Sequence, residues 1–215
     1  MSRLLMIALL CSFNAWATDA KLEKIHIETG VAALERGADA LMNDCHSCHS
    51  LKYIKYRDLA SFGLDKQKVD AWRGDQPLDA PLLATMSEND ALQAFGKAPP
   101  DLSLMARARD GGVSYLYSYL LGYYVTPEGV TSNHIYPATR MPDPLGISGA
   151  TVPAQRTEIQ GRARDIVSFL AWAADPHQGE RIRLGYYVIA YLIVLTTLLY
   201  FVKNLIWSRL KRSSI

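Results

Sequence analysis

Cys45-His46-Ser47-Cys48-His49 has the form Cys-x-x-Cys-His, the pattern by which a haem is attached covalently to a chain. The two thiols add to the vinyl groups of the porphyrin, and the adjoining His49 becomes a ligand of the iron. Both sulfurs and the imidazole have to come from one turn of chain, which this spacing allows. The pentapeptide therefore predicts one haem c, attached at Cys45 and Cys48, with His46 as a linker residue.

Two other readings of the motif find less support in the sequence. A thioredoxin-like redox pair is expected in a βαβ setting, and the residues around Cys45 do not suggest one. Half of a zinc site requires further Cys or His nearby, and none follow closely. Haem attachment is the reading that the sequence favours.

The first seventeen residues have the pattern of a secretory signal peptide. Arg3 precedes an apolar run from Leu4 to Phe13, and Ala15-Trp16-Ala17 offers a small-residue cleavage site. An uncleaved anchor is the alternative, although the run is short for a membrane span. Removal of residues 1–17 also removes Cys11, so the mature chain keeps only Cys45 and Cys48 and has no structural disulfide.

A second apolar segment lies near the C-terminus and predicts a transmembrane helix over 184–203. From Leu184 to Val202 it has no charged residue, and at about 1.5 Å per residue this length approaches the hydrocarbon thickness of a bilayer. The following tail, 204–215, is basic and is expected to stay in the cytoplasm. Residues 18–183 then face the periplasm of a bacterial inner membrane, which the protein crosses once. A buried core helix is the alternative.

The charge of the exported part indicates what it binds. The whole chain has 23 Lys and Arg against 21 Asp and Glu. Arg3 and four basic residues at or after Lys203 lie outside residues 18–183, which leaves 18 basic against 21 acidic side chains. This balance does not favour nucleic acid as a ligand and suits a basic protein partner.

Apolar spacing predicts a mainly α fold. Three- and four-residue steps indicate helices over 30–49, 113–124 and 159–174, the last ending before Pro176. Residues 63–100 are mixed and polar, so loops and short helices are expected there. Prolines recur between Pro127 and Pro153, which predicts an extended loop. No segment has the alternation of a strand.

A sixth ligand for the iron is sought among methionines, because His/Met ligation gives the higher potentials of electron carriers. Met141 is the best candidate, since it lies in a proline-stiffened loop between Pro137 and Pro144. His134 is the next candidate. The other methionines and histidines fit this role less well: Met42 is too close to the attachment helix, Met86 and Met105 are expected in the core, and His26 and His177 at the surface. Arg107 and Arg109 are equally plausible partners for the haem propionates.

The ordered set of motifs resembles cytochrome c1, the haem c subunit of the ubiquinol–cytochrome c reductase. After the pentapeptide come SLKYIKYR (50–57), PPDLS (99–103), ARDGG (108–112), Tyr115, LGY (121–123), Met141-Pro142, FLAWAADP (169–176) and the C-terminal apolar segment. The resemblance covers nearly all of the mature chain.

The resemblance implies a cytochrome c-like helical domain with one C-terminal transmembrane helix. It assigns Cys45, Cys48 and His49 to haem attachment and proximal ligation, and Met141 to distal ligation. Arg109 and Tyr115 match positions that contact a propionate, which favours Arg109 over Arg107, and Pro99 and Pro100 match positions that line the haem pocket. Residues 93–98 lack an expected Asn-rich run, so haem contacts there are not carried over.

The family's role is to take one electron from the Rieske iron–sulfur protein and pass it to a soluble cytochrome c, beside cytochrome b in the membrane lipid. The resemblance therefore implies an electron carrier without catalytic residues of its own. One alternative is the monohaem subunit of another respiratory complex, such as a terminal oxidase. Another is a haem enzyme such as a peroxidase, which would need an iron position that Met141 does not fill.

Overall fold

The computed structural model describes residues 21–213, so the expected signal peptide at 1–17 lies outside the described residues. The chain divides into two units, one ending at Ala174 and the other beginning at Asp175. The first unit holds the Cys-x-x-Cys-His motif, and the second consists chiefly of a single long helix.

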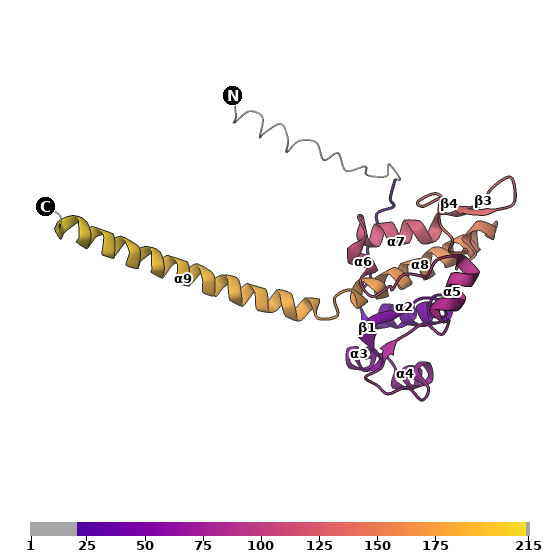
Figure 1. Ribbon diagram of the computed structural model, residues 1–215, viewed down its shortest axis with the longest axis horizontal. Helices are drawn as coiled ribbons and strands as arrows, with labels where there is room; N and C mark the ends of the chain where they lie inside the picture. The colour runs from indigo at the N-terminus through magenta and orange to yellow at the C-terminus, as the bar shows by residue number, and fades with distance from the viewer. Residues whose placement is uncertain (1–20, 214–215) are drawn as a thin grey trace, which may run out of the picture. The chain divides into compact units, whose positions relative to one another are not determined.

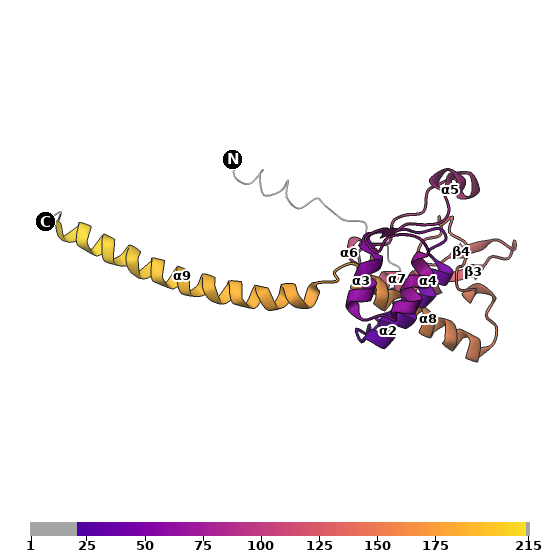
Figure 2. The same ribbon diagram turned by 90° about the horizontal axis from the view of Figure 1, so that it is seen from below.

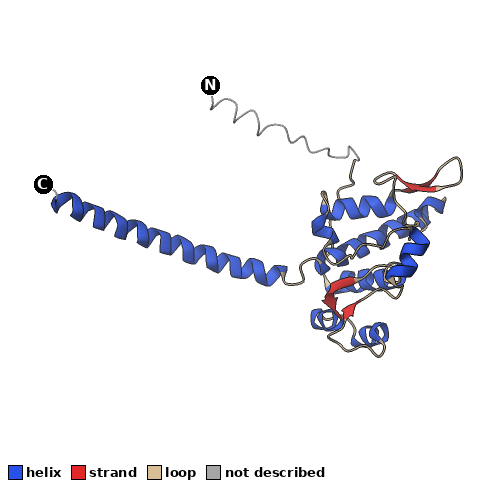
Figure 3. Cartoon of the chain, viewed as in Figure 1, coloured by secondary structure: helices blue, strands red, loops and turns tan. Residues whose placement is uncertain are grey.

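The first unit is mainly helical, as the sequence predicts (Figures 1 and 3). Its α-helices are α2 (Val31–Asp44), α3 (Tyr56–Phe62), α4 (Lys66–Arg73), α5 (Glu88–Phe95), α6 (Met105–Ala108), α7 (Gly112–Leu121) and α8 (Pro153–Ala173). A 3₁₀ turn covers Ile147–Gly149. Figure 2 shows α5 standing apart from the other helices of this unit, and most of its residues are exposed.

Two small antiparallel sheets correct the expectation that the chain has no strands. In the first, β1 (Leu51–Lys55) pairs with β2 (Pro81–Leu82), and Leu51 faces Leu82 across the pair. In the second, β3 (Tyr123–Val125) pairs with β4 (Thr131–Asn133) in regular register. Strands of two to five residues are too short for alternation to show in a sequence, because a period of two needs several repeats to be visible.

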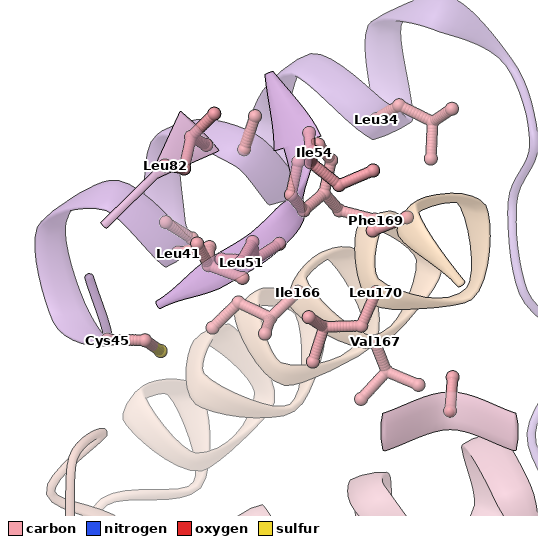
Figure 4. Close-up of a cluster of buried hydrophobic side chains, with 14 of the residues drawn as sticks. Leu34, Leu41, Cys45, Leu51, Ile54, Leu82, Ile166, Val167, Phe169 and Leu170 are labelled. Atoms are coloured by element: carbon pink, nitrogen blue, oxygen red, sulfur yellow. The ribbon is translucent and has the colours of Figure 1, made fainter. Parts of the chain in front are cut away.

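The packing of α2 against α8 forms the centre of the first unit. Figure 4 shows Leu34 and Leu41 of α2 facing Ile166, Phe169 and Leu170 of α8, with side chains of β1 and β2 on the same cluster. Gly37 lets the helices approach closely, because a Cβ there would lie 2.1 Å from the Asp165 carbonyl oxygen.

Two ion pairs join α2 to α8, one near each end of the contact between these helices. Arg36 on α2 binds Asp165 on α8 at 2.9 Å, and Arg162 on α8 binds Asp44 on α2 at 2.6 Å. Both arginines bind their carboxylate through two nitrogens, the geometry in which an Arg–carboxylate pair fixes orientation best. The second pair lies directly before Cys45, so it fixes the point where the motif leaves α2.

The two other predicted helices exist but have different ends. The helix expected over 113–124 ends at Leu121, because Gly122 packs closely under Asn133 and the chain then enters β3. The helix expected over 159–174 already begins at Pro153. Its first residues are exposed and polar, so they lack apolar spacing, while Pro at the first position favours a helix start.

The second unit contains α9 (Gln178–Ser213). Residues Gln178–Leu210 of this helix are long and apolar enough to cross a membrane. Large apolar side chains are exposed along it, such as Leu184 and Ile189, which are 63% and 58% exposed. Helical structure extends beyond the predicted 184–203 in both directions, by several residues at the start and about ten at the end.

Candidate haem site

The Cys-x-x-Cys-His motif forms a turn that continues from the end of α2. The regular helix ends at Asp44, five residues before the predicted end at His49. The chain then folds back on itself, with the amides of Cys48 and His49 donating to the Cys45 carbonyl at 3.1 and 2.9 Å. This turn brings both cysteines and the histidine close together along one short piece of chain, as attachment to a single porphyrin requires.

The two thiols of the motif differ in environment. Cys45 is buried at the end of the α2–α8 core, where Figure 4 shows it beside Leu41 and Leu51. Burial, with a smaller contribution from neighbouring Asp44, raises the pKa of the Cys45 thiol to about 12. Cys48 is half-buried, and its sulfur lies 3.6 Å from the Ser47 hydroxyl. Neither forms a disulfide.

His49 has the hydrogen bond that prepares an imidazole to bind a metal. Its ring is buried, and Nδ1 lies 2.8 Å from the carbonyl oxygen of Pro100. A carbonyl can only accept, so Nδ1 carries the proton and the lone pair is left on Nε2. Burial lowers the pKa of His49, although the bond to Pro100 and the charge of Asp101 oppose the shift. The ring is therefore neutral near pH 7, and the residues fit a haem iron.

Pro100 is itself held in place by its neighbours. The carboxylate of Asp101 accepts from the amides of Lys52 and Ser103 at 2.8 and 2.9 Å, and the Leu102 amide donates to the Ser50 carbonyl at 2.8 Å. The segment after Pro100 is thus tied to the chain that leaves His49. Pro99, the other predicted pocket residue, precedes it and is half-buried.

Met141 lies in an irregular segment and packs against the hydrophobic core cluster that contains Cys45. Its amide donates to the Thr139 hydroxyl at 3.2 Å. The alternative ligand His134 is exposed, and its ring stacks on Tyr124 with 4.1 Å between centroids. The structure therefore places Met141, rather than His134, at the core cluster.

The remaining histidines and methionines occupy three kinds of position: the surface, the core cluster and the border of the motif. His26 and His177 are exposed, in keeping with the expected surface positions, and Met42 and Met105 pack against the core cluster. Met86 is half-buried, and its amide donates to the Ser47 carbonyl at 2.9 Å, so it borders the motif.

Arg109 and Tyr115 come together as a pair. The Arg109 guanidinium carbon lies 5.9 Å from the centre of the Tyr115 ring, within the range of a cation–π contact. Tyr115 packs against the same core cluster as Met141. Burial raises the pKa of the Tyr115 hydroxyl, and the charge of Arg109 opposes this. Arg107 lies exposed on α6, two residues before Arg109.

Two features of the site were missed by sequence reasoning. His46, expected to be a linker, is buried, and its Nε2 has no hydrogen-bond partner among the described residues. Burial lowers the pKa of His46. The second is the Thr139 hydroxyl, which also meets Tyr119 of α7 at 2.5 Å. No sequence pattern relates residues twenty positions apart in a loop and a helix, so this contact required the structure.

Within residues 21–213, no three His, Cys, Asp or Glu side chains gather as a metal site made from those residues would require. The zinc interpretation of the motif therefore gains no support from the described part of the chain.

Comparisons with known proteins agree on one family. The model of the cytochrome C1 family matches residues 16–81 and 72–210. The chain is 33% identical to cytochrome c1 of Allochromatium vinosum over 207 residues, which covers 82% of this chain and 84% of that protein. It is 31% identical to the mitochondrial cytochrome c1 haem protein of Neurospora crassa, covering 85% of this chain and 64% of that protein.

A solved structure has the same fold. A chain of a hyperthermophilic respiratory Complex III matches with a TM-score of 0.51 and 21% identity, over 96% of this chain and 93% of that chain. At this identity the likeness concerns the fold alone.

Proposed function

The chain belongs to the cytochrome c1 family, and we propose that it is the electron-transfer subunit of a ubiquinol–cytochrome c reductase. In this role it takes one electron from the Rieske iron–sulfur protein and passes it to a soluble cytochrome c. The observation that carries the proposal is the bond between His49 Nδ1 and the Pro100 carbonyl directly after the Cys-x-x-Cys turn. This bond leaves the Nε2 lone pair of a neutral, buried imidazole free, so that Nε2 could bind haem iron.

The cofactor we propose is one haem c. Cys45 and Cys48 would attach it through thioether bonds, and His49 and Met141 would be the two protein ligands of its iron. The haem supplies one-electron redox chemistry. The protein's part is to hold both axial side chains and to keep water away, and the core cluster shared by Cys45 and Met141 provides that apolar setting.

Two protein ligands on the iron would also exclude the binding of a substrate there. With His49 and Met141 both bound, no coordination position is left for a substrate, so we propose that the chain carries electrons and has no catalytic residue. A peroxidase-type function would require the Met141 side to be open.

Arg109 and Tyr115 are proposed to meet a haem propionate. The guanidinium offers several N–H donors, and the Tyr115 hydroxyl can donate another. The ring of Tyr115 beneath Arg109 restricts the guanidinium, so less ordering is needed when it binds the carboxylate.

We further propose that α9 anchors the subunit in the bacterial inner membrane, beside cytochrome b. The haem domain faces the periplasm and the tail lies in the cytoplasm. The exposed apolar side chains of α9 suit lipid or another membrane helix, and the basic residues beyond Val202 favour the cytoplasmic side.

Purification from detergent-solubilised membranes tests the proposal. The full chain, tagged at its C-terminus, should bring with it b-type haem and a Rieske iron–sulfur centre, detected by reduced-minus-oxidised difference spectra and by electron paramagnetic resonance. The purified complex should reduce cytochrome c with a ubiquinol. The proposal would be contradicted if a haem–copper oxidase co-purified with the chain and the sample contained neither the b-type haem of the reductase nor a Rieske centre.

A further inference from the structure

A chain of hydrogen bonds connects α7 to the segment that bears Met141. The Tyr123 hydroxyl donates to the Tyr119 hydroxyl at 3.0 Å, and the Tyr119 hydroxyl lies 2.5 Å from the Thr139 hydroxyl. The Met141 amide donates to the same Thr139 oxygen at 3.2 Å. Groups from a helix, a strand and a loop are therefore joined by successive hydrogen bonds.

The direction of these bonds follows from the protons available. Tyr119 accepts from Tyr123, so its own hydroxyl proton is free to be donated to Thr139. The Thr139 oxygen has two lone pairs, and it can accept from Tyr119 and from Met141 at once. Burial raises the pKa of the Tyr123 hydroxyl, which keeps its proton in place as the first donor.

Tyr119 is rigidly placed, so it can serve as a fixed point. Its ring stacks on Tyr115 with 6.1 Å between centroids and meets Tyr123 edge-on at 5.6 Å. Its carbonyl accepts from the side-chain amide of Asn133, which is fully buried, at 2.8 Å. Movement of the Tyr119 hydroxyl would require all of these contacts to shift.

The residue between Thr139 and Met141 has an anchor of its own. Arg140 Nη1 donates to the carbonyl of Phe95, the last residue of α5, at 3.1 Å. Gly96 makes room for this contact, since a Cβ there would lie 2.1 Å from Arg140 Nη1. After Met141, the carboxylate of Asp143 accepts from three amides at 2.7 to 3.3 Å, so the chain is fixed beyond the methionine as well.

We propose that Tyr119 is a positioning residue for Met141, and that its hydroxyl, acting through Thr139, fixes the loop in the conformation that presents the thioether. This inference rests on the proposed function, in which Met141 is the distal ligand. A thioether is a weak ligand, so the fraction of molecules with the bond formed depends on how much chain must be ordered to form it. A loop already fixed at Thr139 makes the bond more persistent.

Two variants remove the hydroxyls and keep the shapes. Tyr119→Phe keeps the stacked ring, and Thr139→Val keeps the branched side chain. Tyr124→Phe is the matched control, because Tyr124 lies in β3 and, among the described residues, no hydrogen bond joins its hydroxyl to residues 139–141. Each variant is made in the full chain and purified from membranes in detergent with its haem attached.

The first measurement is the affinity of the oxidised protein for imidazole, which competes with Met141, followed through loss of the Fe–S absorption feature. Loss of one hydroxyl bond should raise this affinity about three- to tenfold in both Tyr119→Phe and Thr139→Val. The double variant should show less than the product of the two single effects, because both act through one bond. Tyr124→Phe should bind imidazole as the unaltered chain does.

The second measurement is hydrogen exchange of the peptide that contains the Met141 amide. Exchange should be faster in Tyr119→Phe and Thr139→Val and unchanged in Tyr124→Phe. Suppose that the Fe–S feature is present in the unaltered chain and absent from Met141→Leu, so that the ligand assignment stands. Unchanged imidazole affinity in both hydroxyl variants would then overturn the positioning role of Tyr119. If Met141→Leu leaves that feature unchanged, the ligand assignment itself is wrong and the positioning role falls with it.

Discussion

At the scale of single residues, the distal ligand can be tested directly. Met141→Leu should leave the haem attached at Cys45 and Cys48 but remove the Fe–S absorption feature. It should lower the reduction potential by on the order of 100 mV, because a thioether favours the reduced iron. Met105→Leu is the control, since Met105 packs against the same core cluster and the exchange conserves volume. Redox titration checks both variants, and equal potentials would contradict the assignment of Met141.

The proposed contact of Arg109 with a propionate also has an electrostatic consequence. Arg109→Gln removes a positive charge. Because this removal favours the oxidised haem, the reduction potential should fall by about 20–50 mV. Arg107→Gln removes the same charge two residues away, on α6, and should have a smaller effect. The comparison is made by redox titration at low and at moderate salt. A larger shift in the Arg107 variant would reverse the assignment.

Before haem attachment, the buried thiol of Cys45 should make the stability of the chain and its reaction with alkylating reagents depend on pH. Its pKa is raised from about 9 to about 12 by burial, so the unfolded chain loses this proton first between those values. Unfolding therefore becomes easier as pH rises through this range, and the folded thiol resists alkylation, which needs the thiolate. At pH 9, mass spectrometry should find Cys48 alkylated before Cys45, and equal rates only in urea. Equal rates without urea would contradict the burial of Cys45.

At the scale of elements, the approach of α2 to α8 depends on Gly37. Gly37→Ala places a Cβ against the Asp165 carbonyl and the Phe169 side chain, so the helices must separate. The free energy of unfolding should fall by about 1–3 kcal/mol. Gly161→Ala on α8 meets nothing within 4 Å and should raise it by about 0.5–1 kcal/mol through helix propensity. Chemical unfolding followed by circular dichroism checks both, and a fall of equal size in the two variants would contradict the role given to the Gly37 contact.

Comparison of the predicted and observed helices and strands shows which of them the sequence alone could predict. Apolar spacing was sufficient for α2, α7 and α8, because each buries one face against the core. It placed their ends less well: α2 ends at Asp44 so that the motif can form its turn, and α8 starts at Pro153 in a polar stretch. The short strands were missed, since each pairs with a partner that lies about six to thirty residues away in the sequence.

The sequence names candidate residues for the site, but it does not give the contacts that these residues make. The motif and the ordered resemblance named His49, Pro100, Arg109 and Tyr115, and the structure brings these residues together as two pairs. The bonds of Tyr119 to Thr139, and the burial of His46, depend on the folded arrangement of α7, the loop and the end of α2. No local pattern encodes such contacts.

At the scale of the whole molecule, α9 belongs to a separate unit from the one that contains the Cys-x-x-Cys-His motif, and we propose that α9 anchors that unit at the membrane. A chain ending at Ala174 loses the long apolar helix while the haem-bearing unit keeps all of its own elements. We expect this truncated chain to be released as a soluble haem protein into the periplasm. Cell fractionation with haem staining checks this, and a truncated chain that stays in the membrane fraction would show that the haem domain has a membrane contact of its own.

The orientation that we propose for α9 rests on the unequal charge at its two ends. The segment 175–183 contains Asp175 and Glu180 as well as Arg181 and Arg183, whereas every charged residue from Lys203 onward is basic. Positive flanks remain in the cytoplasm. A green fluorescent protein fused after Ile215 should therefore fluoresce, and alkaline phosphatase at the same position should be inactive, because it needs the oxidising periplasm for its disulfides. Phosphatase fused after Ala174 should be active. The opposite pattern at Ile215 would mean that the helix enters the membrane in the reverse direction and that the haem domain faces the cytoplasm.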